Sequence, residues 1–182
     1  LARGFRPEPD EPTMHLPAHD RYPYRPIHGR APYAWPGGRR LAFYMGLNIE
    51  HFAYGEGLGS ELVPIAGQPD VLNYAWRDYG NRVGVWRMLE LFDGLGLPCT
   101  ALLNSTIYPY APEIPAAFRR RGDEIAAHGR SNSERQGSLD EAAERALIAE
   151  TTEVIAAAEG QPPRGWLGPW ISQSHATPDL LQ

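Results

Sequence analysis

The segment EIAAHGRSN (residues 124–132) decides the fold, because a short apolar run ends there in polar side chains that can carry chemistry. Two other segments, LNIEH (47–51) and GWLGPW (165–170), end in the same way with polar or aromatic groups. In parallel α/β sheets and barrels, the carboxyl ends of the strands hold the site residues. Three such ends in one chain predict a composite functional site at one rim of a parallel sheet.

The apolar pattern around these segments predicts alternating strands and helices. We expect strands over residues 41–47, 98–103, 123–127 and 164–167. We expect a long loop over 52–75 and helices over 78–95, over 111–121 and from Ser138 onward. This order implies parallel strands joined by right-handed crossovers, which is an α/β fold. Because four parallel strands cannot close a barrel, the chain is expected to form part of a larger domain.

The longest helix carries clear signals at both ends. Ser138 and Glu141 have the spacing of a capping box, and Gly160 fits the position just after the last turn. Its expected inner face consists of Ala143, Leu147, Thr151, Val154, Ile155 and Ala158.

The composition argues against several classes of partner. The chain has 182 residues, a net charge of −5 and 21% charged residues, which does not favour a nucleic-acid or anionic-membrane partner. No stretch approaches the roughly 20 apolar residues that span a bilayer, and the first residues lack the apolar core of a signal peptide. Cys99 is the one cysteine, so we expect a buried structural thiol and no intrachain disulfide. We predict a cytoplasmic protein.

Residues 1–40 differ from the remainder, because they are rich in proline, arginine and tyrosine. Proline excludes a regular helix or a central strand, whereas the aromatic residues argue against free disorder. We therefore expect an extended arm over 1–40 that wraps along the domain or a neighbouring subunit, and a homo-oligomer. The barrel part is expected over residues 41–182.

Several motifs together resemble the polysaccharide deacetylase (NodB-homology) family. They are WPGG (35–38), LNIE (47–50), VWR (85–87) with Leu91-Phe92, and EIAAHG (124–129). The most similar branch is the one that holds metal-independent allantoinases. The resemblance implies a distorted (β/α) barrel of the NodB type, of which this chain holds about the first half. It also implies hydrolysis of a non-peptide carbon–nitrogen bond.

The resemblance also assigns positions in the site. Metal-dependent members of the family use an Asp-Asp pair after the first strand and a His-x-x-x-His pair after the third. Here Asn48 stands at the position of the base, Glu50 at the carboxylate ligand, His128 at the first histidine and Asn132 at the second. An asparagine is neither a base nor a good zinc ligand, so we expect no cofactor. If a divalent ion such as Zn²⁺ is present, Glu50 and His128 would hold it.

The residue types themselves suit amide hydrolysis. Glu50 could deprotonate water, and His128 could act as the acid or electrophile, the two sharing a proton near neutral pH. Asn48 and Asn132 can donate to a developing oxyanion. Candidate substrate contacts are Asn132, Arg130, Trp170 and His175, whereas His51 suits a structural role and a site role equally well.

Two functions therefore stay open at this stage. The first is a hydrolase that attacks an N-acetyl group or a small cyclic amide or ureide, with a small-molecule or saccharide substrate. The second is a catalytically inactive domain that binds a carbohydrate or a protein partner, which Asn48 and Asn132 support.

Overall fold

A computed structural model describes residues 19–63, 67 and 69–182. The expected arm over 1–40 therefore lies partly outside the described residues. The chain separates into two compact units, Leu1–Ala42 and Phe43–Gln182. Within the first unit, Tyr22, Tyr24 and Tyr33 are exposed in the single chain. The wrapping of the arm along the domain or a neighbouring subunit stays a prediction. A short 3₁₀ turn, η1 (Pro36–Gly38), is the regular element of its described part.

Three short parallel strands form the sheet, as expected for an α/β fold. They are β1 (Gly46–Ile49), β2 (Thr100–Leu103) and β3 (Glu124–Ala127), in the order β1-β2-β3. The register pairs Ile49 with Leu103 and Leu103 with Ala127, so these side chains share one face. The described sheet is open, and this agrees with the incomplete barrel of NodB type expected from the sequence.

Two expected strands differ from the structure. The first begins only at Gly46, and Leu41, Phe43 and Tyr44 before it are exposed. The fourth is reduced to a single parallel bridge between Ala127 and Trp166. Pro162 and Pro163 precede this segment, and prolines cannot donate to a sheet ladder.

The helix expected over 78–95 begins seven residues earlier and is interrupted. It consists of α1 (Val71–Tyr79), a π-helical turn η2 (Gly80–Gly84) and α2 (Val85–Leu95). Asp70 sets the start, because its side chain accepts a hydrogen bond from the Asn73 amide. The end follows the expectation, with Gly96 in the left-handed conformation.

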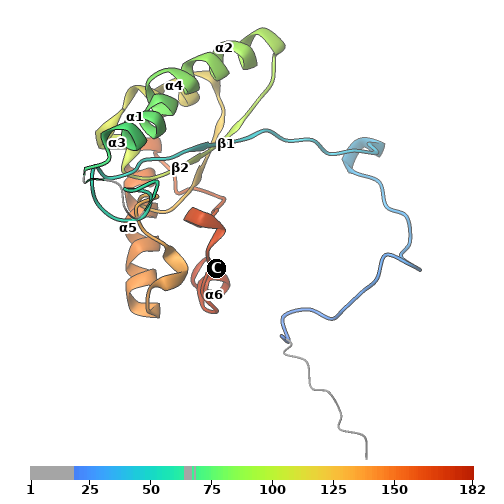
Figure 1. The fold of residues 1–182 in the computed structure, drawn as a ribbon. Helices are drawn as coiled ribbons and strands as arrows, with labels where there is room; N and C mark the ends of the chain where they lie inside the picture. Colours follow the sequence, from blue (N-terminus) through green and yellow to red (C-terminus); the bar gives the residue numbers. More distant parts are fainter. Residues whose placement is uncertain (1–18, 64–66, 68) are drawn as a thin grey trace, which may run out of the picture. The chain divides into compact units, whose positions relative to one another are not determined.

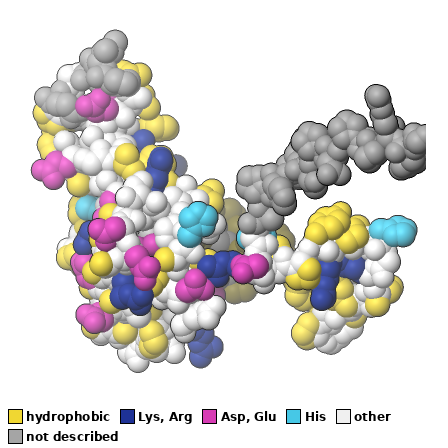
Figure 2. Space-filling model, turned by 90° about the horizontal axis from the view of Figure 1, so that it is seen from below, with side chains coloured by type: hydrophobic (Ala, Val, Ile, Leu, Met, Phe, Trp, Pro, Cys, Tyr) yellow, Lys and Arg dark blue, Asp and Glu magenta, His cyan; other side chains and the backbone are white. Residues whose placement is uncertain are grey.

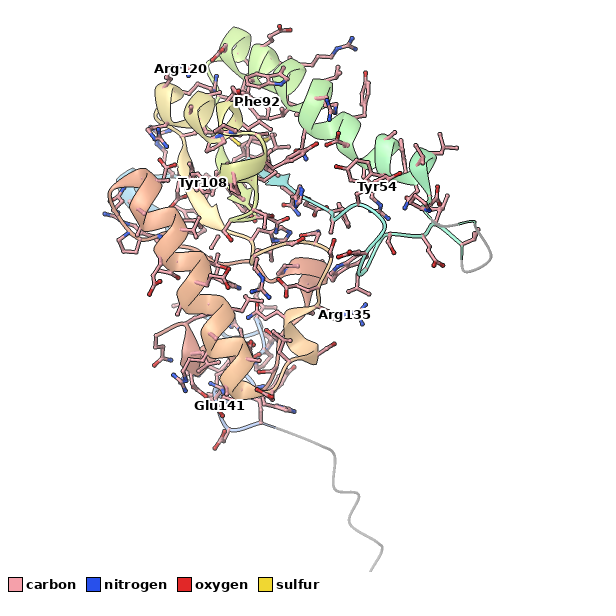
Figure 3. All side chains as sticks on the ribbon, turned by 90° about the vertical axis from the view of Figure 1, so that its left-hand side faces the viewer. Tyr54, Phe92, Tyr108, Arg120, Arg135 and Glu141 are labelled. Carbon is pink, nitrogen blue, oxygen red and sulfur yellow. The ribbon has the colours of Figure 1, made fainter. Side chains whose placement is uncertain are left out.

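The core lies between the sheet and the helices α2 and α4. After α3 (Ile107–Tyr110), α4 (Glu113–Arg121) follows and packs beside α2, as the labelled Phe92 and Arg120 show in Figure 3. The largest buried side chains of this core are Ile49, Leu89, Phe92, Leu103, Ile107, Ile114 and Phe118. Cys99 is buried in the same core, and burial raises the pKa of its thiol to about 11. This supports the structural role expected for it.

The longest helix, α5 (Glu141–Glu159), is capped differently from the expectation. Asp140 is the N-cap and accepts from the Ala143 amide at 2.8 Å, whereas Ser138 belongs to a preceding 3₁₀ turn, η3 (Gln136–Ser138). Gly160 ends the helix in the left-handed conformation, as expected. Figure 3 shows α5 running from Glu141 along the sheet. At its far end, the hydroxyl of Tyr108 donates to Glu159 at 2.8 Å.

The inner face of α5 also differs, because a carboxylate belongs to it. The buried residues are Glu144, Leu147, Ile148, Thr151 and Ile155, whereas Ala143 and Ala158 are exposed. Glu144 accepts hydrogen bonds from Gln136 at 2.8 Å and from the hydroxyls of Ser174 and Thr177. It thereby joins η3 and the short helix α6 (Thr177–Leu180) to α5.

Two further observations bear on partners. On the face seen in Figure 2, acidic and basic side chains of the second unit lie interspersed, without a single-sign field. Among the described residues, no helix combines the length and apolarity that crossing a bilayer requires.

Candidate functional site

The site begins one residue after the end of each strand, where the parallel pairing of the three strands continues for one further residue. The Asn104 amide donates to the Ile49 carbonyl at 3.1 Å, and the His128 amide donates to the Leu103 carbonyl at 2.9 Å. Glu50, Asn104 and His128 therefore stand side by side after β1, β2 and β3. Because side chains alternate along a strand, this row shares its face with Asn48 and not with the helix-covered core.

Glu50 and His128 form the central pair. Oε1 of Glu50 lies 3.4 Å from Nε2 of His128, and the Asn48 amide nitrogen lies 3.3 Å from the same oxygen. The pKa of Glu50 is held below its usual range. The main cause is the contact with the His128 ring, and Asn48 contributes, whereas burial acts in the opposite direction. Glu50 is therefore an ionised carboxylate at neutral pH, which the sequence-based proposal of a shared proton did not anticipate.

His128 is buried, and its ring is fixed from behind. Its Nδ1 lies 2.6 Å from the Leu167 carbonyl, which can only accept, so Nδ1 carries a proton. The buried Nε2 consequently faces Glu50, and it lacks a well-directed hydrogen bond among the described residues. We interpret the 3.4 Å separation as a charge contact, because its geometry is too poor for a hydrogen bond. Nε2 is thus oriented toward the position where a ligand would bind.

A relay of buried amides orients the third side chain. Oδ1 of Asn104 accepts from the His51 amide at 2.8 Å, which fixes the orientation of the Asn104 side chain. Its nitrogen then donates to the His128 carbonyl and, at 3.1 Å, to Oδ1 of Asn132. The Asn132 nitrogen is left to donate toward Glu50, and this contact contributes to the lowered pKa of Glu50.

Gly129 and Trp170 close the site beside Asn132. Gly129 has φ +65°, and a Cβ there would lie 2.7 Å from Pro169, so only glycine fits. Pro169 begins the 3₁₀ turn η4 (Pro169–Ile171), in which Trp170 adopts a positive φ of 61°. Its indole nitrogen donates to the Asn132 carbonyl at 2.9 Å, and its ring meets Phe52 edge-on. The half-exposed indole is therefore held in place beside the site.

The other expected contacts lie elsewhere or are already engaged. Arg130 binds Glu134 through two hydrogen bonds of 2.8 and 2.7 Å and Glu150 through one of 2.8 Å, which does not favour substrate binding. His175 is exposed in the segment between η4 and α6. His51 packs its ring against Tyr110 at 4.7 Å, and burial lowers the pKa of His51. Of its two possible roles, the structure favours the structural one.

A cavity of about 440 Å³ adjoins Glu50. Asn48 lines it from β1 and Glu50 from the position just after that strand. Arg77 and Asn81 line it from the α1–η2 segment, and Phe52 lines it from the loop before α1. The Asn81 side chain donates to the Glu50 carbonyl at 2.8 Å and so anchors the π-helical turn to the end of β1. Such turns often lie at functional sites.

The donor set does not suit the divalent ion that the sequence analysis left open. No group of three or more His, Cys, Asp or Glu residues suited to a metal occurs in the described part of the chain. Glu50 and His128 supply two donors, and the relay directs the oxygen of Asn132 away from them, toward Asn104. A zinc site needs at least three protein ligands, so these residues do not complete one.

The sequence analysis missed three groups of this site. Asn104 was not identified, although it follows the apolar run of β2 just as Glu50 and His128 follow theirs. The Leu167 carbonyl and the π-helical turn were also missed. A backbone carbonyl and a turn defined by backbone hydrogen bonds cannot be recognised from the types of residue in the sequence.

Comparisons with known proteins place this geometry in a family context. No protein-family model matches the chain, and no curated protein sequence matches it significantly. Among solved structures, a PuuE allantoinase is 28% identical with a TM-score of 0.71, and it matches over 88% of this chain and 57% of its own. A probable polysaccharide deacetylase from Pseudomonas aeruginosa PAO1 is 29% identical with the same TM-score and the same coverage.

A putative polysaccharide deacetylase from Mycobacterium smegmatis is also similar, at 26% identity and a TM-score of 0.66 over 84% of this chain and 51% of its own. The chain thus spans little more than half the length of these structures. The expected resemblance to the NodB-type deacetylases and their allantoinase branch is confirmed, as is the fold class.

Proposed function

We propose that this chain is part of a hydrolase that cleaves a non-peptide carbon–nitrogen bond, with Glu50 and His128 as the reacting pair. One observation carries the proposal: the buried Nε2 of His128 faces the ionised Glu50 at 3.4 Å and lacks a well-directed hydrogen bond. Similarity to a PuuE allantoinase and to two polysaccharide deacetylases supports the reaction class. The substrate is a small amide or ureide, or an acetylated saccharide.

The roles follow from the orientation of each atom. Glu50 accepts a proton from a water molecule, whose oxygen attacks the carbonyl carbon. In its imidazolium form, with a proton on each ring nitrogen, His128 donates Nε2–H to the carbonyl oxygen, and the amide groups of Asn48 and Asn132 donate to the developing negative charge. When the tetrahedral intermediate collapses, the carbon–nitrogen bond breaks and the leaving nitrogen receives the proton held by Glu50.

The lowered pKa of Glu50 is compatible with a role as base. His128 is the main cause of that lowering, whereas burial raises the pKa. A substrate carbonyl that accepts the hydrogen bond from His128 removes this contact, so the basicity of Glu50 rises when the substrate binds. The substrate thereby activates the base.

Glu50→Gln tests the mechanism, because it keeps the shape and removes the basicity. We expect turnover of allantoin, hydantoin or an acetylated sugar to fall about 100-fold or more, with substrate binding retained. Glu153→Gln, on the exposed side of α5, is the matched control and should leave turnover unchanged. Equal turnover of the Glu50 variant and the wild type would remove Glu50 from the mechanism.

We also propose that the reaction needs no metal, since Asn132 turns its nitrogen and not its oxygen toward Glu50. Activity should then persist after dialysis against a chelator. A stoichiometric transition metal in the purified protein, measured by plasma mass spectrometry, would return a metal-dependent mechanism to first place.

An inactive binding domain is the second candidate, because Asn48 stands at the position of the base and only donates to Glu50. It predicts that the wild type binds acetylated sugars or ureides without turnover. Substrate binding and turnover measured on the same preparation separate the two functions.

For the oligomer, we propose that α1 contacts α1 of a second copy. Its polar Asn73 and Asp78 are buried, whereas Leu72 is 81% and Trp76 67% exposed. The exposed apolar set comprises Leu62, Val63, Val71, Leu72, Trp76 and Tyr79. If each of these six side chains buries about 100 Å², the two copies together bury about 1,200 Å², which is the lower limit for a specific interface.

Light scattering tests this contact. Trp76→Ser should shift the wild-type dimer to monomer, whereas Leu91→Ser, an exposed position on α2, should not. A monomeric wild type would refute the interface.

A further inference from the structure

The cavity beside Glu50 contains a positive charge that the proposed chemistry does not use. Of the described residues that line it, Arg77 alone is basic, and Glu50 lines the same space. The remaining lining is largely apolar, with Leu47, Val85 and Met88 among it. A charged group in such surroundings normally has a partner of opposite sign.

Arg77 is held in place without a carboxylate. Its Nε donates to Oδ1 of Asn73 at 3.2 Å, and its guanidinium carbon lies 4.4 Å from the centre of the Phe52 ring. Asn73 is itself buried and donates to the Gly59 carbonyl at 2.7 Å. Within the described part of the chain, no carboxylate forms an ion pair with Arg77.

This arrangement leaves the outer edge of the guanidinium for a ligand. Nε is engaged by Asn73, while the two terminal nitrogens make no hydrogen bond within the described part of the chain and can donate side by side. Two parallel donors match the two oxygens of a carboxylate. Stacking on Phe52 restricts the side chain before a ligand arrives, which lowers the entropic cost of binding.

The contrast with Arg130 supports the assignment. The guanidinium of Arg130 is similarly restrained, but Glu134 and Glu150 already occupy its donors. Gly80 lines the same cavity, and a Cβ there would meet no atom within 4 Å, so the space beside it is open. Arg77 therefore combines restraint, a cavity and unused donors.

We propose that Arg77 binds a carboxylate of the substrate, and that the substrate is an anionic amide or ureide. The acid group lies on Arg77, the middle of the molecule lies against the apolar wall, and the scissile carbonyl lies between Glu50 and His128. This inference rests on the proposed function and names the substrate class of the same site. Arg77 is a specificity-determining residue and takes no part in proton transfer.

Calorimetric binding of two ring-matched probes tests the inference. Hydantoin is neutral, and hydantoin-5-acetate adds one carboxylate to the same ring. We expect the wild type to bind the acid about 10- to 100-fold more tightly, as a charge-assisted bidentate contact implies. Arg77→Met keeps an apolar stem over Phe52 and should abolish the preference, while leaving hydantoin affinity within about twofold.

Two further variants control the experiment. Arg77→Lys keeps the positive charge but lacks the two parallel N–H donors of the guanidinium, and it should retain part of the preference for the acid. Arg87→Met removes an exposed arginine on α2 and should change neither affinity. If Arg77→Met unfolds, the test rests on the lysine variant and on the salt dependence of wild-type binding. Raising NaCl from about 50 to about 500 mM should weaken the binding of hydantoin-5-acetate and leave the binding of hydantoin unchanged.

The outcomes separate this inference from the proposed function. A wild type that binds hydantoin-5-acetate no more tightly than hydantoin, or binds neither, overturns the role of Arg77. Equal weakening of both probes in Arg77→Met overturns it as well. If Arg77→Met loses the preference while the wild type hydrolyses neither these probes nor allantoin nor an acetylated sugar, the anion site stands and the hydrolase is rejected.

Discussion

Replacing Asn104 with alanine should destabilise the protein far more than one lost hydrogen bond. The Asn104 side chain satisfies three groups: the His51 amide, the His128 carbonyl and the Asn132 side-chain oxygen. His128 and Asn132 are 2% and 4% exposed, so bulk solvent does not reach the groups that lose their partner. The substitution therefore affects the ends of all three strands.

The magnitude follows from counting the unsatisfied groups. Each buried polar group left without a partner costs about 1–3 kcal/mol. Two buried groups and one half-buried amide, partly rescued by a water molecule in the vacated space, give about 3–5 kcal/mol. Asn81→Ala is the matched control, because it removes a single hydrogen bond to the Glu50 carbonyl and should cost about 1 kcal/mol.

Urea unfolding followed by circular dichroism measures both values, provided that the slope m stays constant. A loss in Asn104→Ala no greater than that in Asn81→Ala would show that the amide relay does not hold the strand ends together. The orientation assigned to Asn132 would then lose its support as well.

Three further predictions concern other parts of the fold. Hydrogen bonds from Ser174, Thr177 and Gln136 outweigh burial and lower the pKa of Glu144, so its contribution to stability is full above the unfolded value near 4.5 and is lost as the pH falls below it. The wild type should therefore lose stability in urea titrations as the pH falls below about 4.5, and Glu144→Gln should flatten this dependence. Parallel curves would contradict the assignment. Gly129→Ala should lower the melting temperature by several degrees because of its positive φ and the close approach of Pro169, whereas Gly94→Ala, which meets no neighbour, should not. Asn132→His should raise zinc affinity, because it adds a third donor near Glu50 and His128. A calorimetric titration measures this affinity. An unchanged value would show that the contact with Asn104 keeps the side chain at position 132 turned away from the site.

Several features of the protein were predictable from sequence because they depend on local pattern. Short apolar runs identified β2 and β3, and Gly160 marked the end of α5, since the left-handed conformation favours glycine there. Competing local signals caused the errors. Ser138 and Asp140 are both good caps, and tertiary contacts selected Asp140 by drawing Ser138 into η3.

The sequence by itself determined the parallel α/β architecture and the meeting of Glu50 with His128, because residues that follow parallel strands come together at one rim. Only the tertiary structure decided which atoms of the neighbouring side chains face Glu50. The Leu167 carbonyl selects which nitrogen of His128 faces Glu50, and Asn104 selects which atom of Asn132 does. Both choices depend on hydrogen bonds between segments distant in the chain, and such bonds form only once the strands are in register.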